Sequence, residues 1–271
     1  MDLPWTQPDL ARQCPAAMLY QENSVLNPAR AAGFQERILA FTEAQLAEDG
    51  ARAAAKTYPH GRRVALPGGP WRTRAVERVI ERRRTRRAFT GKGISARRLG
   101  RILRCAGGIT GRASGPVGEV GPVGDVALRA CPSAGALYPL EVYPVVLRSP
   151  DLPSGVHHYH VAAHALECLS AGDVRRRLEA DLLGVELMPG ADAALLITSV
   201  LERTLAKYGE RGYRFVLIEV GHLAQNVALV CEAMGLNSVC LGGFHEDGLA
   251  ELLDVDRRRE PVQYVILLGT R

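Results

Sequence analysis

The chain has 271 residues, of which 47% are hydrophobic and 23% are charged. A chain of this length and composition can bury a substantial core, which excludes disorder or a coiled coil as a description of the whole molecule. No stretch reaches the roughly 20 uninterrupted apolar residues of a membrane helix. Residues 1–12 begin with an acidic residue and two prolines and have no apolar run, unlike a secretion signal. We therefore predict a cytoplasmic protein without a membrane segment.

The net charge of +5 is concentrated in one segment. Residues 82–104 hold ten basic residues and no acidic ones, so this segment carries +10 and the rest of the chain sums to 5 − 10 = −5. Aromatic residues make up only 6% of the chain, a poor supply of stacking surface for a nucleic-acid-binding protein. We therefore expect no nucleic-acid partner. The six cysteines include no Cys-x-x-Cys pair, so we expect no zinc site either.

Residues 1–72 are predicted to form an N-terminal extension, and residues 73–271 the main domain. After a proline-containing start, a helix is expected over about 29–56. Residues 58–70 are rich in proline and glycine, which interrupt regular structure. We interpret this stretch as a linker between the extension and the main domain.

In the main domain, hydrophobic periodicity predicts helices and strands in turn. Helices are expected over 74–84, over 95–103 with Ser95 as N-cap, and over 173–182, 213–234 and 246–253. Strands are expected over 142–147, 156–159, 193–200, 238–241 and 262–268. Residues 107–124 are rich in glycine and predict a mobile loop. The order of elements indicates an α+β fold in which helices cover a sheet.

The basic segment opens with a run of arginines at 82–84 and 86–87. Guanidinium groups stay charged and suit phosphate or another oxyanion. A solvated surface accounts for such a run about equally well. Gly242 and Gly243 follow a predicted strand that ends at Leu241, and backbone N–H groups there can approach a ligand, although an ordinary turn has the same composition. The chain has no P-loop and no Rossmann glycine motif, which disfavours a classical nucleotide site.

Two further groups of polar residues are candidates for chemistry. Lys207 and Tyr208 follow a predicted buried strand, and such a pair can remove and relay a proton. By residue type alone, an exposed lysine and a half-buried tyrosine are the commoner outcome. His158 and His160 would face one side of a strand. No carboxylate or third ligand is near them in the sequence, so we predict no metal site.

Five segments taken in order resemble the SagB-type dehydrogenases, a branch of the FMN-dependent nitroreductase superfamily. They are residues 82–89 (RRRTRRAF), 132–141 (PSAGALYPLE), 202–214, 221–226 and 242–244 (GGF). The resemblance runs from about residue 76 to the C-terminus. In addition, residues 20–24 and 56–59 resemble the leader region of that family.

The resemblance implies a nitroreductase-like α+β fold, built as an intertwined homodimer with two FMN molecules at the dimer interface. Matched position by position, the implied cofactor-binding residues are Arg82, Arg83 and Arg86 of the basic motif, Pro132, Ser133, Ala134 and Ala136 of a loop from the partner subunit, Leu241, Gly242 and Gly243 at the flavin turn, and Arg271 near the phosphate. Arg84 belongs to the same motif, although family members usually have serine there, and its role is open. An amide residue expected at or beside Val185 is absent.

In family members that form azoles, a Lys–Tyr pair is implicated in catalysis, and Lys207 and Tyr208 match it. The resemblance therefore implies oxidation of thiazoline or oxazoline rings in a ribosomally made peptide. A base removes the ring Cα proton, a hydride passes to FMN, and oxygen reoxidises the flavin. The implied partners are the peptide substrate and a cyclodehydratase. An FMN oxidoreductase acting on a carrier-bound or small electron-poor substrate and a flavin-free scaffold subunit remain alternatives.

Overall fold

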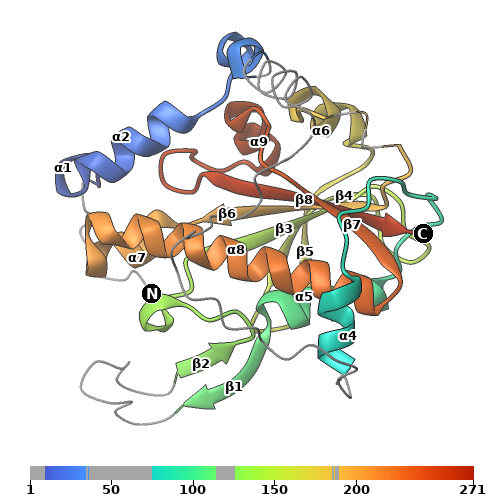
Figure 1. Cartoon of the computed structure of the whole chain (residues 1–271). Helices are drawn as coiled ribbons and strands as arrows, with labels where there is room; N and C mark the ends of the chain where they lie inside the picture. The colour runs from blue at the N-terminus through green and yellow to red at the C-terminus, as the bar shows by residue number, and fades with distance from the viewer. Residues whose placement is uncertain (1–9, 35, 37–74, 114–125, 185, 187–188) are drawn as a thin grey trace, which may run out of the picture.

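The centre of the molecule is a six-stranded sheet in which all paired strands run antiparallel (Figure 1). The computed structural model describes residues 10–34, 36, 75–113, 126–184, 186 and 189–271. In pairing order the strands are β5 (Ala165–Ala171), β4 (Gly155–His160), β3 (Leu140–Val146), β6 (Ala193–Ser199), β8 (Val262–Thr270) and β7 (Leu236–Leu241). A separate hairpin pairs β1 (Ile109–Ala113) with β2 (Val126–Arg129).

The middle strands of the sheet are buried on both faces because their sequences are almost continuously apolar. All seven residues of β6 are buried, and only Gln263 and Tyr264 of β8 are partly exposed. A strand covered on both faces needs apolar side chains on both, so the period-two alternation is lost. Alternate residues enter two separate clusters, since Leu195 faces one and Leu196 the other.

Helices cover the two faces of this sheet and confirm the predicted α+β class. One face carries α5 (Ala96–Gly107), α7 (Leu201–Tyr208) and the long α8 (Glu210–Ala233), with α4 (Ala75–Arg82) against α8. The other face carries α6 (Arg175–Asp181) and α9 (Glu246–Leu253). Ser95 is the N-cap of α5 as predicted, and its side chain accepts a hydrogen bond from the N–H of Arg98.

Among the described helices, α8 is the one that is long and apolar enough to cross a bilayer. Its residues Val216, Leu223 and Val227 are buried in the core, and the core helix of a folded protein passes the same test. Residue polarity does not fully decide which side of α8 is buried. Glu219 is only 4% exposed, whereas Ile218 is 48% exposed, so a carboxyl faces inward and an isoleucine faces outward.

The described part of the N-terminal segment packs against α8. It contains α1 (Leu10–Gln13) and α2 (Pro15–Ser24), which were not predicted. The N–H groups of Ala16 and Ala17 donate to the carboxylate of Glu210, at 2.9 and 2.6 Å. Within the helix predicted over 29–56, residues 29–34 and 36 are helical. The remainder of that helix, the linker at 58–70, the 72/73 boundary and the leader-like 56–59 lie outside the described residues.

One sequence-based expectation was wrong, and some elements were not predicted. Residues 109–113, predicted as part of a loop, form β1, because Ile109 and Thr110 favour a strand and β2 supplies hydrogen-bond partners. β5 was not predicted, since this edge strand is mostly exposed and lacks an apolar face. α7, which is only eight residues long, was not predicted either. Lys207 and Tyr208 therefore lie at the end of a helix rather than in a loop.

Candidate functional site

The segment after α4 carries the basic motif to β7. The N–H of Arg86 donates to the carbonyl of Ser238 in β7 at 3.1 Å. With the backbone held there, Arg83 lines a cavity of about 200 Å³ between α8 and the sheet. Hydroxyl, amide, thiol and aromatic groups line the same cavity, at Thr85, Gln225, Ser238, Cys240 and Tyr264. This cavity therefore offers a cation and several hydrogen-bonding groups to one ligand.

Two more of the predicted arginines meet at Glu232, near the C-terminal end of α8. Arg86 Nε lies 3.8 Å and Arg271 Nη2 lies 2.5 Å from Glu232 Oε2. Arg271 Nε also donates to Asn237 Oδ1 at 3.1 Å. Since β8 ends beside β7 and α8, the fold brings the last residue of the chain next to the basic motif.

The other two arginines of the motif lie differently. Arg82 is the exposed last residue of α4. The guanidinium of Arg84 turns back on its own helix, where Nη1 donates to the carbonyls of Glu81 and Arg83, each at 2.8 Å. A cation at this position satisfies carbonyl groups left free where a helix ends. The role of Arg82 and Arg84 toward a cofactor remains a prediction.

The predicted glycine turn comes next to the arginine cavity. Leu241 is the buried last residue of β7. A Cβ placed on Gly242 would lie 3.8 Å from the ring of Tyr264, the ring that also lines the Arg83 cavity. A Cβ on Gly243 would lie only 3.2 Å from Leu183, whose N–H donates to the Gly243 carbonyl at 3.0 Å. The structure thus brings the basic motif and the glycine turn together.

A second group of predicted residues meets at Gly135. The loop of residues 132–138 contains the short 3₁₀ turn η1 (Ala134–Ala136) and passes beside the end of α7. A Cβ on Gly135 would lie 2.6 Å from Tyr208 Oη and 3.0 Å from Lys207 Nζ. Lys207 is exposed and Tyr208 half-buried. Lys207 Nζ and Tyr208 Oη therefore both reach the loop at Gly135, which has no side chain.

This loop has an unusual backbone that hydrogen bonds hold in place. Gly135, Ala136 and Tyr138 all have positive φ, at 61°, 53° and 46°, a conformation that costs about 1–2 kcal/mol for a residue with a Cβ. The N–H of Tyr138 donates to Ser133 Oγ at 2.9 Å, and Tyr138 Oη accepts from the N–H of Arg129 at 3.0 Å. Such strain is typical of functional sites that the surrounding structure constrains.

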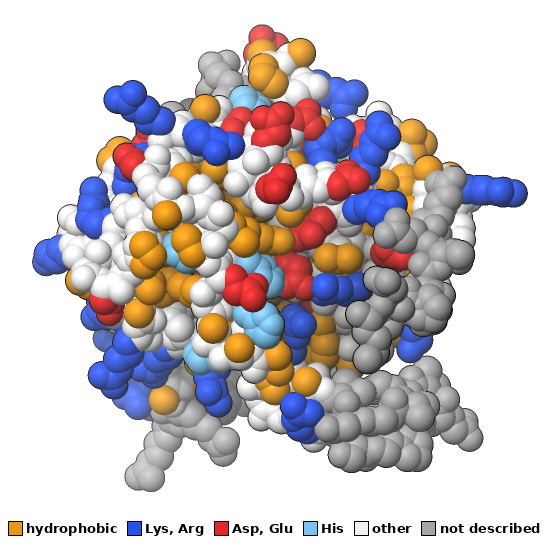
Figure 2. Space-filling model, turned by 180° about the vertical axis from the view of Figure 1, so that it is seen from behind, with side chains coloured by type: hydrophobic (Ala, Val, Ile, Leu, Met, Phe, Trp, Pro, Cys, Tyr) orange, Lys and Arg blue, Asp and Glu red, His pale blue; other side chains and the backbone are white. Residues whose placement is uncertain are grey.

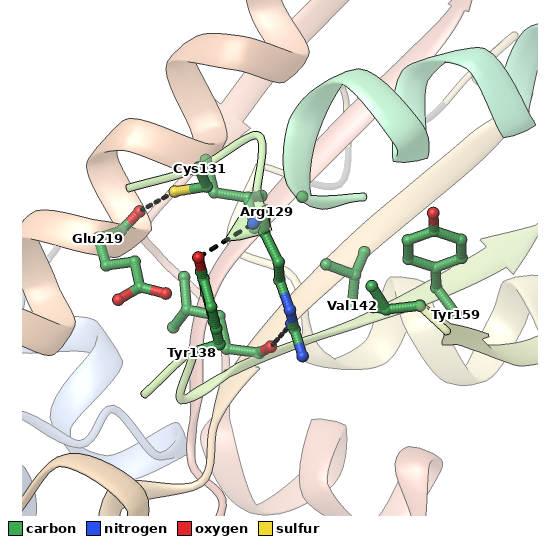
Figure 3. A pocket seen from close by; sticks show the side chains of 10 residues that line it. Arg129, Cys131, Tyr138, Val142, Tyr159 and Glu219 are labelled. Carbon is green, nitrogen blue, oxygen red and sulfur yellow. Dashed lines mark hydrogen bonds between the residues drawn. The ribbon is translucent and has the colours of Figure 1, made fainter. Parts of the chain in front are cut away.

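A buried carboxyl lies behind the loop (Figure 3). Burial raises the pKa of Glu219 in α8 to about 7, against the opposing effects of a hydrogen bond with Ser133 and the charge of Arg129. The cavity beside it measures about 10 Å³, about what one water needs. Burial and nearby Glu219 raise the pKa of the Cys131 thiol to about 12, so that thiol stays protonated and is not a nucleophile.

The two groups of residues lie on different sides of α8. Gly221 and Gln225 line the arginine cavity, whereas Glu219 backs the loop of residues 132–138. Successive residues of a helix are rotated by about 100°, so Glu219 and Gly221 point to nearly opposite sides. Within one chain, the arginines and the glycine turn come together, and the loop and the Lys–Tyr pair come together. The helix separates these two groups.

The histidines of β4 do not form a metal site. Both ring nitrogens of His158 are occupied, by Glu141 at 3.0 Å and Glu167 at 2.9 Å. Among the described residues, no group of three or more His, Cys, Asp or Glu side chains is arranged to hold a metal ion. These two carboxylates are not evident from the sequence around His158, because strand pairing brings them there from β3 and β5.

Three polar residues at the site were not predicted. Glu219 belongs to the core helix, and Glu141 lies at the end of the 132–141 motif. Arg203 lies one helical turn before Lys207, and its Nη1 donates to the carbonyl of Tyr138 at 3.0 Å. Their positions within the matched segments were the available clue, since Glu141 and Arg203 stand inside two of the five motifs.

The six-stranded antiparallel sheet, with α8 on one face, is the nitroreductase fold. The model of the Nitroreductase family matches residues 80–270, and the chain belongs to this family of oxidoreductases. It is 32% identical over 180 residues to the nitroreductase-like protein MJ1384 of Methanocaldococcus jannaschii, covering 66% of this chain and 84% of that protein.

The chain, whose motifs resemble those of SagB-type dehydrogenases, is also similar to a microcin-processing protein. It is 32% identical over 136 residues to the microcin B17-processing protein McbC of Escherichia coli. That match covers 48% of this chain and only 50% of McbC. A chain of the E. coli microcin synthetase McbBCD complex, solved with truncated pro-MccB17 bound, has the same fold, with a TM-score of 0.60 and 22% identity over 94% of this chain and 97% of that chain.

Proposed function

We propose that this protein is an FMN-dependent dehydrogenase that oxidises thiazoline or oxazoline rings of a ribosomally made peptide to thiazoles or oxazoles. The observation that carries the proposal is the meeting of Lys207, Tyr208 and Gly135 beside a constrained loop. Similarity to a microcin-processing protein supports a role in the biosynthesis of a modified peptide. The proposed location is the cytoplasm, where such a peptide is made.

The residues around the Arg83 cavity fit FMN. Members of the nitroreductase family bind FMN, whose phosphate and hydroxyl-bearing chain need cationic and hydrogen-bonding partners. Arg83, Gln225 and Ser238 supply such partners at the cavity. Arg86 and Arg271 form ion pairs with Glu232 nearby. Gly242 and Gly243 leave backbone exposed at its edge, where a flat ring can approach closely. FMN bound there would supply the hydride acceptor, with oxygen as the final oxidant.

Two chains would complete each site. Exposed apolar side chains lie on neighbouring α4 and α8, at Val76, Ile80, Leu217 and Ile218, with 39–57% of each exposed. Leu217 and Ile218 share one side of α8 with Gly221 and Gln225, since residues three, four or seven apart lie on the same side of a helix. This apolar surface therefore continues into the arginine cavity. A homodimer through it would bring the partner's loop and Lys–Tyr pair toward the flavin.

The chemistry assigned to the Lys–Tyr pair follows from its position. Oxidising an azoline removes a proton from the ring Cα and a hydride from the adjacent ring carbon. Lys207 is exposed and its Nζ reaches the loop surface, which supports its assignment as the base that takes the proton. Tyr208 is held by an edge contact with the ring of Phe215, with centroids 5.1 Å apart, and its Oη orients the ring or relays the proton. The implied partner that makes the azoline is a cyclodehydratase.

The decisive experiment combines colour with mass. Purified protein is incubated with an azoline peptide, and loss of two hydrogen atoms per ring is followed by mass spectrometry. Wild-type protein is expected to be yellow and active, and Lys207→Ala yellow and inactive. Lys92→Ala, which removes an exposed lysine elsewhere, is the matched control and stays active. Protein that leaves the peptide unchanged but reduces a quinone or nitroarene with NAD(P)H would instead support an oxidoreductase of another substrate. A colourless chain that takes up no FMN would support a scaffold subunit.

A further inference from the structure

His158 lies between two carboxylates on the sheet. Its Nε2 is 3.0 Å from Glu141 Oε2 on β3, and its Nδ1 is 2.9 Å from Glu167 Oε2 on β5. A neutral imidazole has one N–H, whereas an imidazolium has two. Because a carboxylate only accepts hydrogen bonds, both contacts form together only when His158 is protonated.

The surroundings of His158 favour its protonated form. Burial lowers its pKa, but hydrogen bonds with Glu167 and Glu141 outweigh that effect, so the net pKa is raised. Tyr143 on β3 faces it, with ring centroids 5.2 Å apart. Asp254 and Glu260, from the connection between α9 and β8, line the same cavity of about 510 Å³. Figure 2 shows histidine and acidic side chains gathered among hydrophobic ones on this side of the molecule.

The carboxylate of Glu141 links His158 to the candidate catalytic site. While Oε2 contacts the imidazole, Oε1 accepts a hydrogen bond from Arg203 Nη1 at 2.5 Å. The same Nη1 donates to the carbonyl of Tyr138, whose φ is +46°. Arg203 lies in α7 one turn before Lys207. A continuous chain of charged contacts thus runs from β5 to both elements that meet at Gly135.

We propose that protonated His158 is a positioning residue that fixes Glu141, and through Arg203 holds the strained 132–138 loop against α7 beside Lys207 and Tyr208. Its effect on catalysis rests on the proposed function; its effect on the loop does not. Losing the proton leaves one of the two carboxylates without its donor. Glu141, whose side chain is only 13% exposed, then holds Arg203 less firmly, and the loop and α7 open more often.

The contribution of His158 to the stability of the fold also decreases as pH rises. Since the pKa of His158 is raised on folding, its contribution is complete below the unfolded value of about 6.5 and is lost as pH rises through the folded value. Glu219, which backs the same loop from α8, also titrates in this range, with a pKa of about 7. The test must therefore separate the two groups.

The test is hydrogen exchange of the FMN-loaded protein at residues 132–138 and 201–208, corrected for intrinsic rates, between pH 6 and 9. Wild-type protein is expected to lose protection as pH rises. His158→Gln, which keeps one donor, should exchange roughly fivefold faster at pH 6 and lose most of the pH dependence. Glu167→Gln, at a side chain 52% exposed, should show a smaller change in the same direction without disturbing the core. Glu219→Gln should retain the His158-dependent part.

A control variant makes the outcome decisive. His160→Gln replaces a neighbouring histidine of the same strand and should leave the exchange of both segments unchanged. If His158→Gln matches wild type, or if wild-type protection does not vary with pH, the positioning role is wrong. Because exchange needs no substrate, this result stands whether or not the protein oxidises azolines. With an active peptide, His158→Gln should lower kcat at pH 6 more than it changes KM.

Discussion

Gly135 shows how one residue decides whether the candidate site can form. Its φ is +61°, and the space that a Cβ would fill is occupied by Tyr208 Oη and Lys207 Nζ. The polar ends of Lys207 and Tyr208 therefore lie against the backbone of the loop at Gly135. Glu219 is a second residue of this kind, because burial behind the loop raises the pKa of its carboxyl to about 7.

Gly135→Ala should reduce ring oxidation by more than about tenfold, since Lys207 and Tyr208 must move away from the loop. Gly235→Ala is the matched control. Its φ is +69° and no atom lies within 4 Å of the added Cβ, so it introduces the backbone strain, about 1–2 kcal/mol, without the collision. Steady-state kinetics and thermal unfolding of both variants separate the two effects. Equal activity in the two variants would show that the contact at Gly135 is unimportant.

Glu219→Gln should weaken the pH dependence of stability. The folded protein keeps a proton on Glu219 that the unfolded chain releases near its usual pKa of 4.5. The free energy of unfolding therefore falls as pH rises from about 4.5 to about 7, and the glutamine variant should lose this part of the slope. Urea unfolding at several pH values measures it. Burial also raises the pKa of Glu246 to about 7, so the glutamine variant should keep part of the slope. A slope equal to that of the wild type would contradict the raised pKa of Glu219.

At the scale of elements, α8 organises the site. It separates the arginine cavity from the loop, supplies Gln225 to the cavity and Glu219 to the loop, and packs against the core along its length. Its N-terminal residue, Glu210, also accepts the N–H groups of Ala16 and Ala17 at the start of α2. A carboxylate there is favourable because the free N–H groups of a helix N-terminus carry positive partial charge.

Glu210→Ala should loosen α2 from α8 by about 1 kcal/mol, the usual cost of losing an N-terminal cap. Limited proteolysis within residues 10–24 should then be severalfold faster, while ring oxidation changes little. Glu251→Ala, at an exposed glutamate of α9, is the control and should leave cleavage unchanged. Equal cleavage of the two variants would mean that other contacts, such as the hydrogen bond between Tyr213 and Gln21, hold α2 alone.

At the scale of the whole molecule, the arginine cavity and the loop of residues 132–138 lie on different sides of α8, so a complete site would need a second chain. The exposed apolar surface of α4 and α8 borders the arginine cavity, and it is the surface through which the proposed dimer would form. An apolar surface of this kind marks an interaction site when its residues are contiguous. Cofactor binding and dimer formation are then coupled, because the flavin would contact both chains.

Ile218→Asp should convert the dimer to a monomer and weaken FMN retention, since a buried unpaired carboxylate opposes association. Sedimentation velocity and flavin absorbance after dialysis measure the two effects together. Leu19→Asp changes a leucine that is 65% exposed on α2 and should leave both unchanged. A dimer that persists with its flavin in the Ile218 variant would place the interface elsewhere.

The central strands, α4, α5, α8 and α9 were predictable because their apolar periodicity and caps are local properties of the chain. β1, β5 and α7 were not, since each is short or exposed and depends on partners distant in sequence. The family and the segments that carry the site were also accessible from the sequence, because the motifs keep their residue types and order. The N-terminal helix α2 was missed because its stability comes from Glu210 and Tyr213 rather than from its own pattern.

By itself, the sequence predicted the α+β class and the family, and it singled out Lys207 and Tyr208 as candidates for chemistry. Only the tertiary structure decided which of these residues meet. It placed Arg84 on its own helix, Arg271 beside Arg86, Glu219 behind the loop and two carboxylates on His158. The physical reason is that strand pairing and helix packing join residues far apart in the chain, and the burial and charge that tune a site arise only after those contacts form.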